Sequence, residues 1–143
     1  MILHGTLRLT DSTARRTCGG FAAFMSENQA VLDRYFGERL FSGSLNIDIP
    51  EPKSLHDELD AGRPSPSFKI PRSALLNMPS YIGDAQVWRC AVTGSKLPAA
   101  GVRYWIFRRI GSRVPAGVLE LLATEGLVLQ YELDHGDPVV IEF

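Results

Sequence analysis

A serine and an asparagine that could ligate a metal ion lie two positions apart in an alternating segment, residues 43–49. Successive side chains of a β-strand point to opposite faces, so Ser44, Asn46 and Asp48 are expected to share one face of a strand. Hydroxyl and carboxamide oxygens suit Mg²⁺, which keeps several waters and takes further ligands from substrate phosphates. The alternative interpretation is an ordinary strand face that points into solvent.

A second candidate is the segment 15–20, which reads Arg-Arg-Thr-Cys-Gly-Gly. Its two arginines could neutralise phosphate, and its glycine pair would let backbone N–H groups approach a phosphate closely. The neighbouring cations would favour the thiolate of Cys18, which we interpret as incidental. The chain contains no G-x-x-x-x-G-K-[ST] motif and no dinucleotide fingerprint. A solvated turn is therefore the alternative interpretation of this segment.

Two further candidate sites, both charged, lie in the carboxyl-terminal half of the chain. Arg103, Arg108, Arg109 and Arg113 occur with no acidic residue between them, so they predict either a local anion site or a solvated strand face. Glu120 interrupts the apolar run Val-Leu-Glu-Leu-Leu. Its carboxylate either points into solvent or accepts hydrogen bonds from a ligand.

Short strands are the elements that must position these residues. Alternation and turn residues predict strands at 2–10, 21–24, 43–49, 67–71, 84–92, 102–108, 117–123 and 138–143. An S-x-x-Q capping box predicts a helix that begins at Ser26 and ends at Gly37, and shorter helices are predicted at 53–59 and, capped by Thr124, at 125–131. The strands do not alternate regularly with long helices, which argues against a doubly wound parallel sheet. The pattern favours a mainly β fold, a closed barrel of about six strands with short helices.

Composition limits the function classes. The chain has 143 residues, of which 45% are apolar, so we expect a single domain over residues 1–143. Fifteen basic residues against sixteen acidic ones argue against a polybasic nucleic-acid binder, and two cysteines cannot form a disulfide scaffold or a four-cysteine zinc site. No signal core follows Met1, and no apolar run approaches the ~20 residues of a membrane helix. We therefore expect a soluble cytoplasmic protein without nucleic-acid or membrane partners; the sequence does not set its oligomeric state.

Several motifs together resemble one family. Gly43-Ser44-Leu45-Asn46-Ile47 resembles the G-T-L-N-[IVL] motif of the archaeal-type, CTP-dependent riboflavin kinases, and residues 15–20 occupy the position of that family's glycine-rich loop. Ser112 stands where the family has a threonine in a basic loop. The family's L-E-I-I-A-P-type strand and D-G-D-x-V-x-I ending correspond to Leu119-Glu120-Leu121-Leu122-Ala123 and His135-Gly136-Asp137-Pro138-Val139-Val140-Ile141.

The resemblance implies a cradle-loop barrel that transfers a phosphoryl group from CTP to the 5′-hydroxyl of riboflavin, giving FMN and CDP. It implies Mg²⁺ as the cofactor, held by Ser44 and Asn46, with Ser112 and Glu120 binding the flavin. Asp48 is a candidate general base if it reaches the ribityl hydroxyl. The nucleotide-binding residues that it implies are Arg15, Arg16, Thr17, Cys18, Gly19, Gly20, Glu125, Gly126, Leu127 and Val128.

Departures from the family pattern leave a second hypothesis open. Arg15 and Thr17 stand where the family has the first two glycines of its loop, and Val128 stands where an arginine is typical. A domain that no longer turns over CTP would show such changes, so the alternative is a non-catalytic flavin- or nucleotide-binding domain on the same barrel. A DNA-binding regulator related to other cradle-loop barrels is disfavoured by the net charge of −1.

Overall fold

The computed structural model describes residues 1–9, 21–50, 55–98 and 100–143. Within them the chain is mainly β, as predicted. The strands are β1 (Ile2–Leu7), β2 (Leu45–Asp48), β3 (Phe68–Ile70), β4 (Ala85–Gly94), β5 (Tyr104–Arg109), β6 (Val118–Ala123) and β7 (Pro138–Glu142). The helices are α1 (Phe21–Phe36), α2 (Leu55–Asp60), α3 (Leu127–Gln130) and a 3-10 turn at Arg72–Ala74. None of the helices in the described ranges is both long and apolar enough to cross a bilayer.

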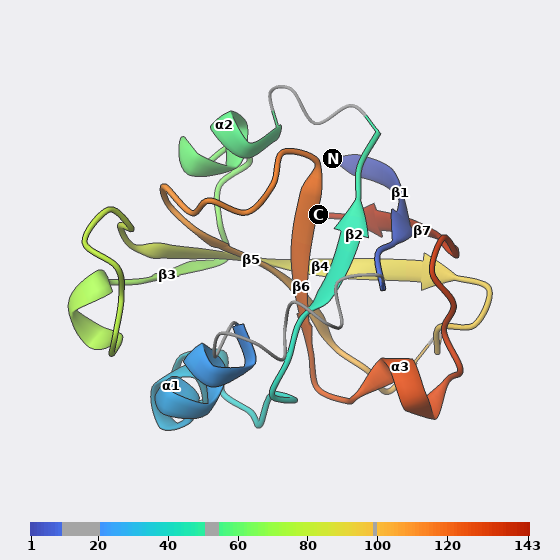
Figure 1. Cartoon of the computed structure of the whole chain (residues 1–143), viewed down its shortest axis with the longest axis horizontal. Coiled ribbons are helices and arrows are strands. Elements are labelled where there is room, and N and C mark those ends of the chain that lie inside the picture. The colour runs from blue at the N-terminus through green and yellow to red at the C-terminus, as the bar shows by residue number, and fades with distance from the viewer. Residues whose placement is uncertain (10–20, 51–54, 99) are drawn as a thin grey trace.

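Six of the described strands close into an antiparallel barrel, which confirms the predicted architecture (Figure 1). The order around the barrel is β4-β5-β6-β2-β1-β7, and β7 pairs back with β4. The long strand β4 closes the ring because its first part pairs with β5 and its last four residues, Ala91 to Gly94, pair with β7. Strand β3 adds to the first part of β4 outside the ring.

Alternation along the strands gives the molecule two cores. Leu45 and Ile47 of β2 belong to the cluster that fills the barrel, together with Leu119 and Leu121 of β6. A second cluster lies between α1 and the outer face of the barrel, where α1 packs against β4, β5 and β6; its members are Phe24, Met25, Leu32, Phe36, Leu40, Ile70, Leu75, Ala85, Val87, Trp105, Phe107 and Leu122. The side chains between the inward residues of β2 therefore point out of the barrel.

Helix α1 begins earlier than the sequence predicts. It starts at Phe21, so the predicted strand at 21–24 and the predicted start at Ser26 are both wrong. Phe24 and Met25 are buried against the barrel, and this burial favours a helical turn that a local capping signal does not reveal. The predicted end is confirmed: Gly37 has a φ of +76° and its N–H donates to the Asp33 carbonyl.

The two shorter helices both contribute to the barrel core. Leu55 and Leu59 of α2 and Leu127 of α3 belong to the inner cluster, and Figure 1 shows the two helices at the top and bottom of the view. Thr124 does not cap α3 as predicted. Its Oγ1 instead accepts the Arg103 N–H at 3.1 Å, while Gly126 stands at the cap position without a side-chain bond.

Candidate functional site

The candidate metal ligands and Glu120 meet on the outer surface of strands β2 and β6. Asn46 lies directly opposite Glu120 in the β2–β6 register. Ser44 precedes β2 and its Oγ donates to Asn46 Oδ1 at 3.2 Å. We call Ser44, Asn46, Asp48 and Glu120 the polar face. It forms because the leucines and isoleucines between these residues point into the barrel.

Ser44 Oγ and Asn46 Oδ1 are oxygens of the kind that Mg²⁺ takes as ligands. In this structure the Ser44 hydroxyl donates to Asn46 Oδ1 at 3.2 Å, so a bound cation would replace that hydrogen bond. Both side chains are half-buried, so substrate oxygens and water can complete the shell. Among the residues that the structure describes, no group of three or more histidine, cysteine, aspartate or glutamate side chains could hold a metal ion. The side chains of Ser44 and Asn46 are both neutral, and such a pair of donors suits a cation that arrives with a phosphate.

Asp48 is engaged by a neighbouring cation. Arg8 Nη1 donates to Asp48 Oδ1 at 3.1 Å, and both side chains are partly buried. The Arg8 N–H also donates to the Asn46 carbonyl at 2.9 Å, which fixes the end of β1 beside β2. The carboxylate that the sequence suggests as a candidate base thus lies in an ion pair on the polar face.

The electrostatic surroundings of Glu120 differ from those of Asp48. Burial raises the pKa of its carboxyl to about 6, and the positive charges of Arg109 and Arg108 offset this effect only in part. Within the described part of the chain, Glu120 makes no hydrogen bond and no ion pair at contact distance. The Glu120 side chain nevertheless keeps some exposed surface. A desolvated, accessible carboxylate of this kind is typical of groups that bind ligands or move protons.

The four arginines of residues 103–113 do not form one anion site. Arg103 pairs with Glu38, and Arg108 makes a bidentate pair with Asp60 at 2.7 and 3.0 Å. Arg113 lies over the ring of Tyr81 at 4.2 Å. Arg109 and Arg108 both act on Glu120, and Arg109 lowers the pKa of that carboxyl more strongly. The Arg109 guanidinium lies 4.7 Å from the centre of the Phe24 ring.

Apart from Glu120 in β6, the described residues that the resemblance assigns to the two substrates lie before and after that strand. Ser112 is in the turn after β5, and its Oγ accepts the Val114 N–H at 3.4 Å. Glu125 accepts a hydrogen bond from the Tyr131 hydroxyl at 3.0 Å. Gly126 packs against Phe41, since a Cβ here would lie 2.6 Å from that ring. The polar face therefore lies between the predicted flavin-contacting turn and the predicted nucleotide-contacting segment.

Of the other residues assigned to the nucleotide, two differ from each other in exposure and six lie outside the described residues. Leu127 is buried in the barrel core, so a ligand could reach only its backbone, whereas Val128 is exposed. The predicted phosphate-binding residues Arg15, Arg16, Thr17, Cys18, Gly19 and Gly20 lie outside the described residues.

Sequence analysis did not identify Arg8 as a neighbour of the polar face, and it did not single out Arg109 from the other arginines. Alternation in residues 104–109 places Arg109 on the same face of β5 as Trp105 and Phe107. This pattern could have distinguished Arg109 from the other arginines. The pairing of Arg8 with Asp48 depends on how β1 and β2 pair, and no local pattern encodes that.

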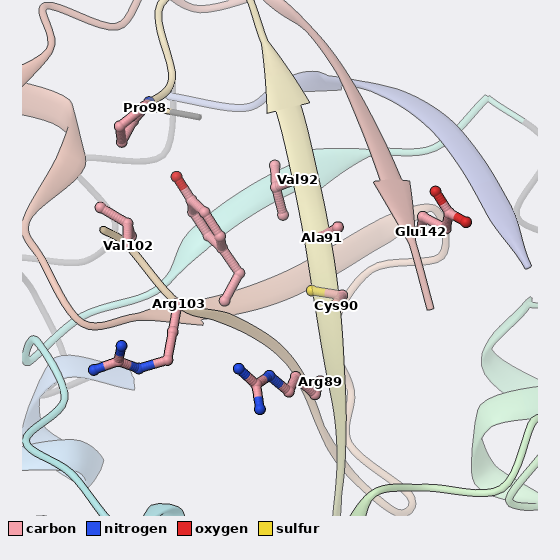
Figure 2. A pocket seen from close by; sticks show the side chains of 9 residues that line it. Arg89, Cys90, Ala91, Val92, Pro98, Val102, Arg103 and Glu142 are labelled. Atoms are coloured by element: carbon pink, nitrogen blue, oxygen red, sulfur yellow. The ribbon is translucent and has the colours of Figure 1, made fainter. Parts of the chain in front are cut away.

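A depression of about 460 Å³ lies elsewhere, beside β4 (Figure 2). Strand β4 is three places from β2 around the ring, so this depression and the polar face lie on opposite sides of the barrel. Burial raises the pKa of the Cys90 thiol to about 12, which leaves it unreactive near neutral pH. The depression contains one candidate residue from the sequence, Arg103 of the predicted anion site. Its lining is Arg89, Cys90, Ala91, Val92, Pro98, Val102, Arg103, Tyr104 and Glu142.

No protein-family model matches the chain, and no curated protein sequence matches it either. The fold and the site together define a closed, six-stranded antiparallel barrel within the described residues, with a polar outer face beside a helix-covered apolar one.

Proposed function

We propose that the protein transfers a phosphoryl group from CTP to the 5′-hydroxyl of riboflavin in the presence of Mg²⁺, giving FMN and CDP. The observation that carries this proposal is the polar face, where two neutral oxygens 3.2 Å apart lie directly across the strand pair from a desolvated carboxylate. The closed antiparallel barrel also supports the proposal, because residues 43–47 and 112–141 resemble motifs of a family whose fold is a barrel.

The proposed reaction depends on positioning and charge rather than on covalent chemistry by the protein. Ser44 and Asn46 would hold Mg²⁺, which when bound would offset negative charge on the transferred phosphoryl group. Ser112, before β6, and Glu120, within β6, orient the flavin and its ribityl chain. The segment that follows β6, from Glu125 onward, contacts the nucleotide.

The second candidate is a non-catalytic flavin- or nucleotide-binding domain on the same barrel. Arg15 and Thr17 in place of loop glycines favour it, because side chains there restrict how closely a backbone can wrap a phosphate. Binding without turnover is what separates this candidate from the kinase.

The first prediction is that the protein forms FMN from riboflavin with Mg²⁺ and CTP, and that Asn46→Ala abolishes this activity. Chromatography of the flavins after incubation with CTP, ATP or GTP, with EDTA as the metal-free control, measures the product. Asn46→Ala should change the free energy of unfolding by only about 0.5 kcal/mol or less, because the Asn46 side chain bonds only to Ser44 among the described residues. It should also lose the Mg²⁺-dependent rise in melting temperature that CTP gives.

Thr93→Ala is the matched control, since Thr93 is exposed on β4 on the opposite side of the barrel. Absence of FMN with all three nucleotides would reject the kinase. Stabilisation by riboflavin or CTP without product would favour the binding domain. An Asn46→Ala variant with normal activity would reject the metal-binding role of Asn46.

A further inference from the structure

The aromatic ring of Phe41 is a large apolar group that the fold holds at the surface. Phe41 is half exposed, with 50% of its surface accessible. A Cβ on Gly126 would lie 2.6 Å from Cε2 of this ring, and a Cβ on Gly43 would lie 3.3 Å from Cε1, on the other side of the ring. The ring therefore lies between the two glycines, and about half of the residue remains open to solvent.

Neither glycine is needed for the backbone conformation at its own position. Gly126 has a φ of −77°, and Gly43 also lies outside the left-handed region that favours glycine. What both positions require is the absence of a side chain, because a Cβ at either one would meet the Phe41 ring. An alanine at position 126 would force the ring to move, since ordinary contacts between carbon atoms are about 3.5–4.0 Å long. The chain thus keeps room for an aromatic ring that it covers only in part.

The segment around Phe41 is anchored on both sides. The Phe41 N–H donates to the carbonyl of Ala123, the last residue of β6, at 3.0 Å. The preceding residue, Leu40, is buried in the outer core. The hydroxyl of the following residue, Ser42, donates to Gln29 of α1 at 2.8 Å. A ring on a segment fixed in this way loses little conformational freedom when a planar ligand stacks on it.

The location of the ring relative to the polar face determines which substrate can stack on it. Gly43 directly precedes Ser44, a proposed Mg²⁺ ligand, and Gly126 belongs to the segment after β6 that would contact the nucleotide. Ser112, which would contact the flavin, precedes β6, whereas Phe41 is bonded to the last residue of that strand. The two ends of a six-residue strand are about 17 Å apart. The ring therefore lies at the nucleotide end of β6.

We propose that Phe41 is the platform on which the base of the nucleotide stacks. This inference rests on the proposed function, and it applies both to the kinase and to the nucleotide-binding domain. With the phosphates beside Ser44 and Asn46, the base lies on the open surface of the Phe41 ring. Every nucleobase has a flat π face, so stacking is tolerant of base identity. Phe41 therefore supplies affinity, and the choice of cytosine falls to groups at the edges of the base.

The second prediction compares CTP with inorganic tripolyphosphate, a probe that carries the phosphates without a base. Phe41→Ala should weaken the binding of CTP with Mg²⁺ by about tenfold or more, because one stack between a base and an aromatic ring is lost. The same variant should bind tripolyphosphate with Mg²⁺ within about twofold of wild type, because the ring offers phosphate neither a charge nor a hydrogen bond. Isothermal titration calorimetry measures both dissociation constants.

Two further substitutions at the same position separate a flat ring from mere apolar bulk. Phe41→Leu keeps an apolar side chain without a flat ring, so it should show most of the loss of CTP affinity. Phe41→Tyr keeps the ring and should keep the affinity. Circular dichroism checks that each variant is folded, and Phe41→Leu provides the comparison if Phe41→Ala does not fold.

Steady-state kinetics give a second readout. The base is remote from the phosphoryl group that moves, so stacking stabilises the bound substrate and the transition state equally. Phe41→Ala should therefore raise the KM for CTP and leave kcat and the KM for riboflavin unchanged. Ile2→Ala is the matched control, since Ile2 is also a large exposed apolar residue and lies on β1, where it pairs with Glu142. This control should leave both dissociation constants unchanged.

The outcomes separate a failure of this inference from a failure of the kinase. FMN formation with a normal KM for CTP in Phe41→Ala would overturn the role of Phe41 and leave the kinase intact. An equal loss of affinity for CTP and for tripolyphosphate in that variant would do the same. A wild-type protein that forms no FMN but binds CTP through Phe41 would reject the kinase and retain the stacking platform. A wild-type protein that does not bind CTP would reject both.

Discussion

At the scale of single residues, Glu120 combines a position useful for chemistry with a cost to stability. Its carboxyl titrates near pH 6 in the folded chain, against an ordinary value of 4.5. The folded protein therefore binds the proton more tightly than the unfolded chain does. The contribution of Glu120 to the free energy of unfolding is therefore fully present below about pH 4.5. It is lost as the pH rises through 6, because the carboxyl ionises more easily in the unfolded chain than in the folded one. Native proteins commonly accept such a cost where a group serves a function.

The third prediction follows from this linkage. Glu120→Gln removes the ionisable group, so it should be more stable than wild type at pH 8 by up to ~2 kcal/mol, and this gain should vanish near pH 4.5. Urea unfolding of both proteins at the two pH values measures the difference. A variant less stable than wild type at pH 8 would show that the Glu120 carboxylate supports the fold through contacts of its own.

At the scale of elements, helix α2 is fastened to the barrel by polar contacts as well as by Leu55 and Leu59. Arg108 of β5 is almost completely buried and forms a bidentate pair with Asp60 at the end of α2. Gln86 of β4 donates through Nε2 to the carbonyls of Leu59 and Asp60. These contacts neutralise a buried guanidinium and satisfy the last carbonyls of a short helix, so α2 depends on β4 and β5 for its position.

The fourth prediction concerns this attachment. Asp60→Asn leaves the Arg108 charge buried without its counter-ion, and we expect the free energy of unfolding to fall by about 3 kcal/mol. Asp57→Asn is the control, because Asp57 lies on the same helix and is exposed. Equilibrium unfolding in urea gives both values. If Asp60→Asn and Asp57→Asn had the same small effect, the Arg108–Asp60 pair would contribute nothing measurable.

At the scale of the whole molecule, closure of the barrel brings the two ends of the described chain together. Strand β1 pairs with β7 over five residues, and the Phe143 N–H donates to the Met1 carbonyl at 3.0 Å. Gly5 lies where β1 crosses β2 at close range. A Cβ at this position would lie 2.6 Å from the Asp48 carbonyl oxygen and 2.6 Å from Ile47 Cγ2. The absence of a side chain at Gly5 therefore allows the ring to close tightly.

The fifth prediction is that Gly5→Ala weakens this closure. Because one of the two closest contacts is backbone, the strands must shift apart, and we expect a loss of about 1–3 kcal/mol in the free energy of unfolding. Gly83→Ala serves as the control, since a Cβ there would meet Ile110 at 3.5 Å, an ordinary contact distance. Thermal unfolding followed by circular dichroism measures both. Equal melting temperatures for Gly5→Ala and wild type would show that β1 and β2 can separate without loss.

The sequence by itself determined the class of fold and the face on which the candidate ligands lie. Alternation along residues 43–49 is enough to place Ser44, Asn46 and Asp48 together on one side of a strand, because the side-chain period of a strand is two. The many short strands and the lack of long alternating helices were enough to predict a barrel. The start of α1 was not predictable locally, because the burial of Phe24 and Met25 against the barrel decides it.

Only the tertiary structure decided which side chains meet across the strands. The register between β2 and β6 sets Asn46 opposite Glu120, and the pairing of β1 with β2 gives Asp48 its arginine partner. Periodicity within one segment says which residues share a face, but it carries no information about which segment becomes the neighbour. The raised pKa of the Glu120 carboxyl has the same origin, since the desolvation that raises it and the arginine charges that partly offset it both come from the packing of other parts of the chain around β6.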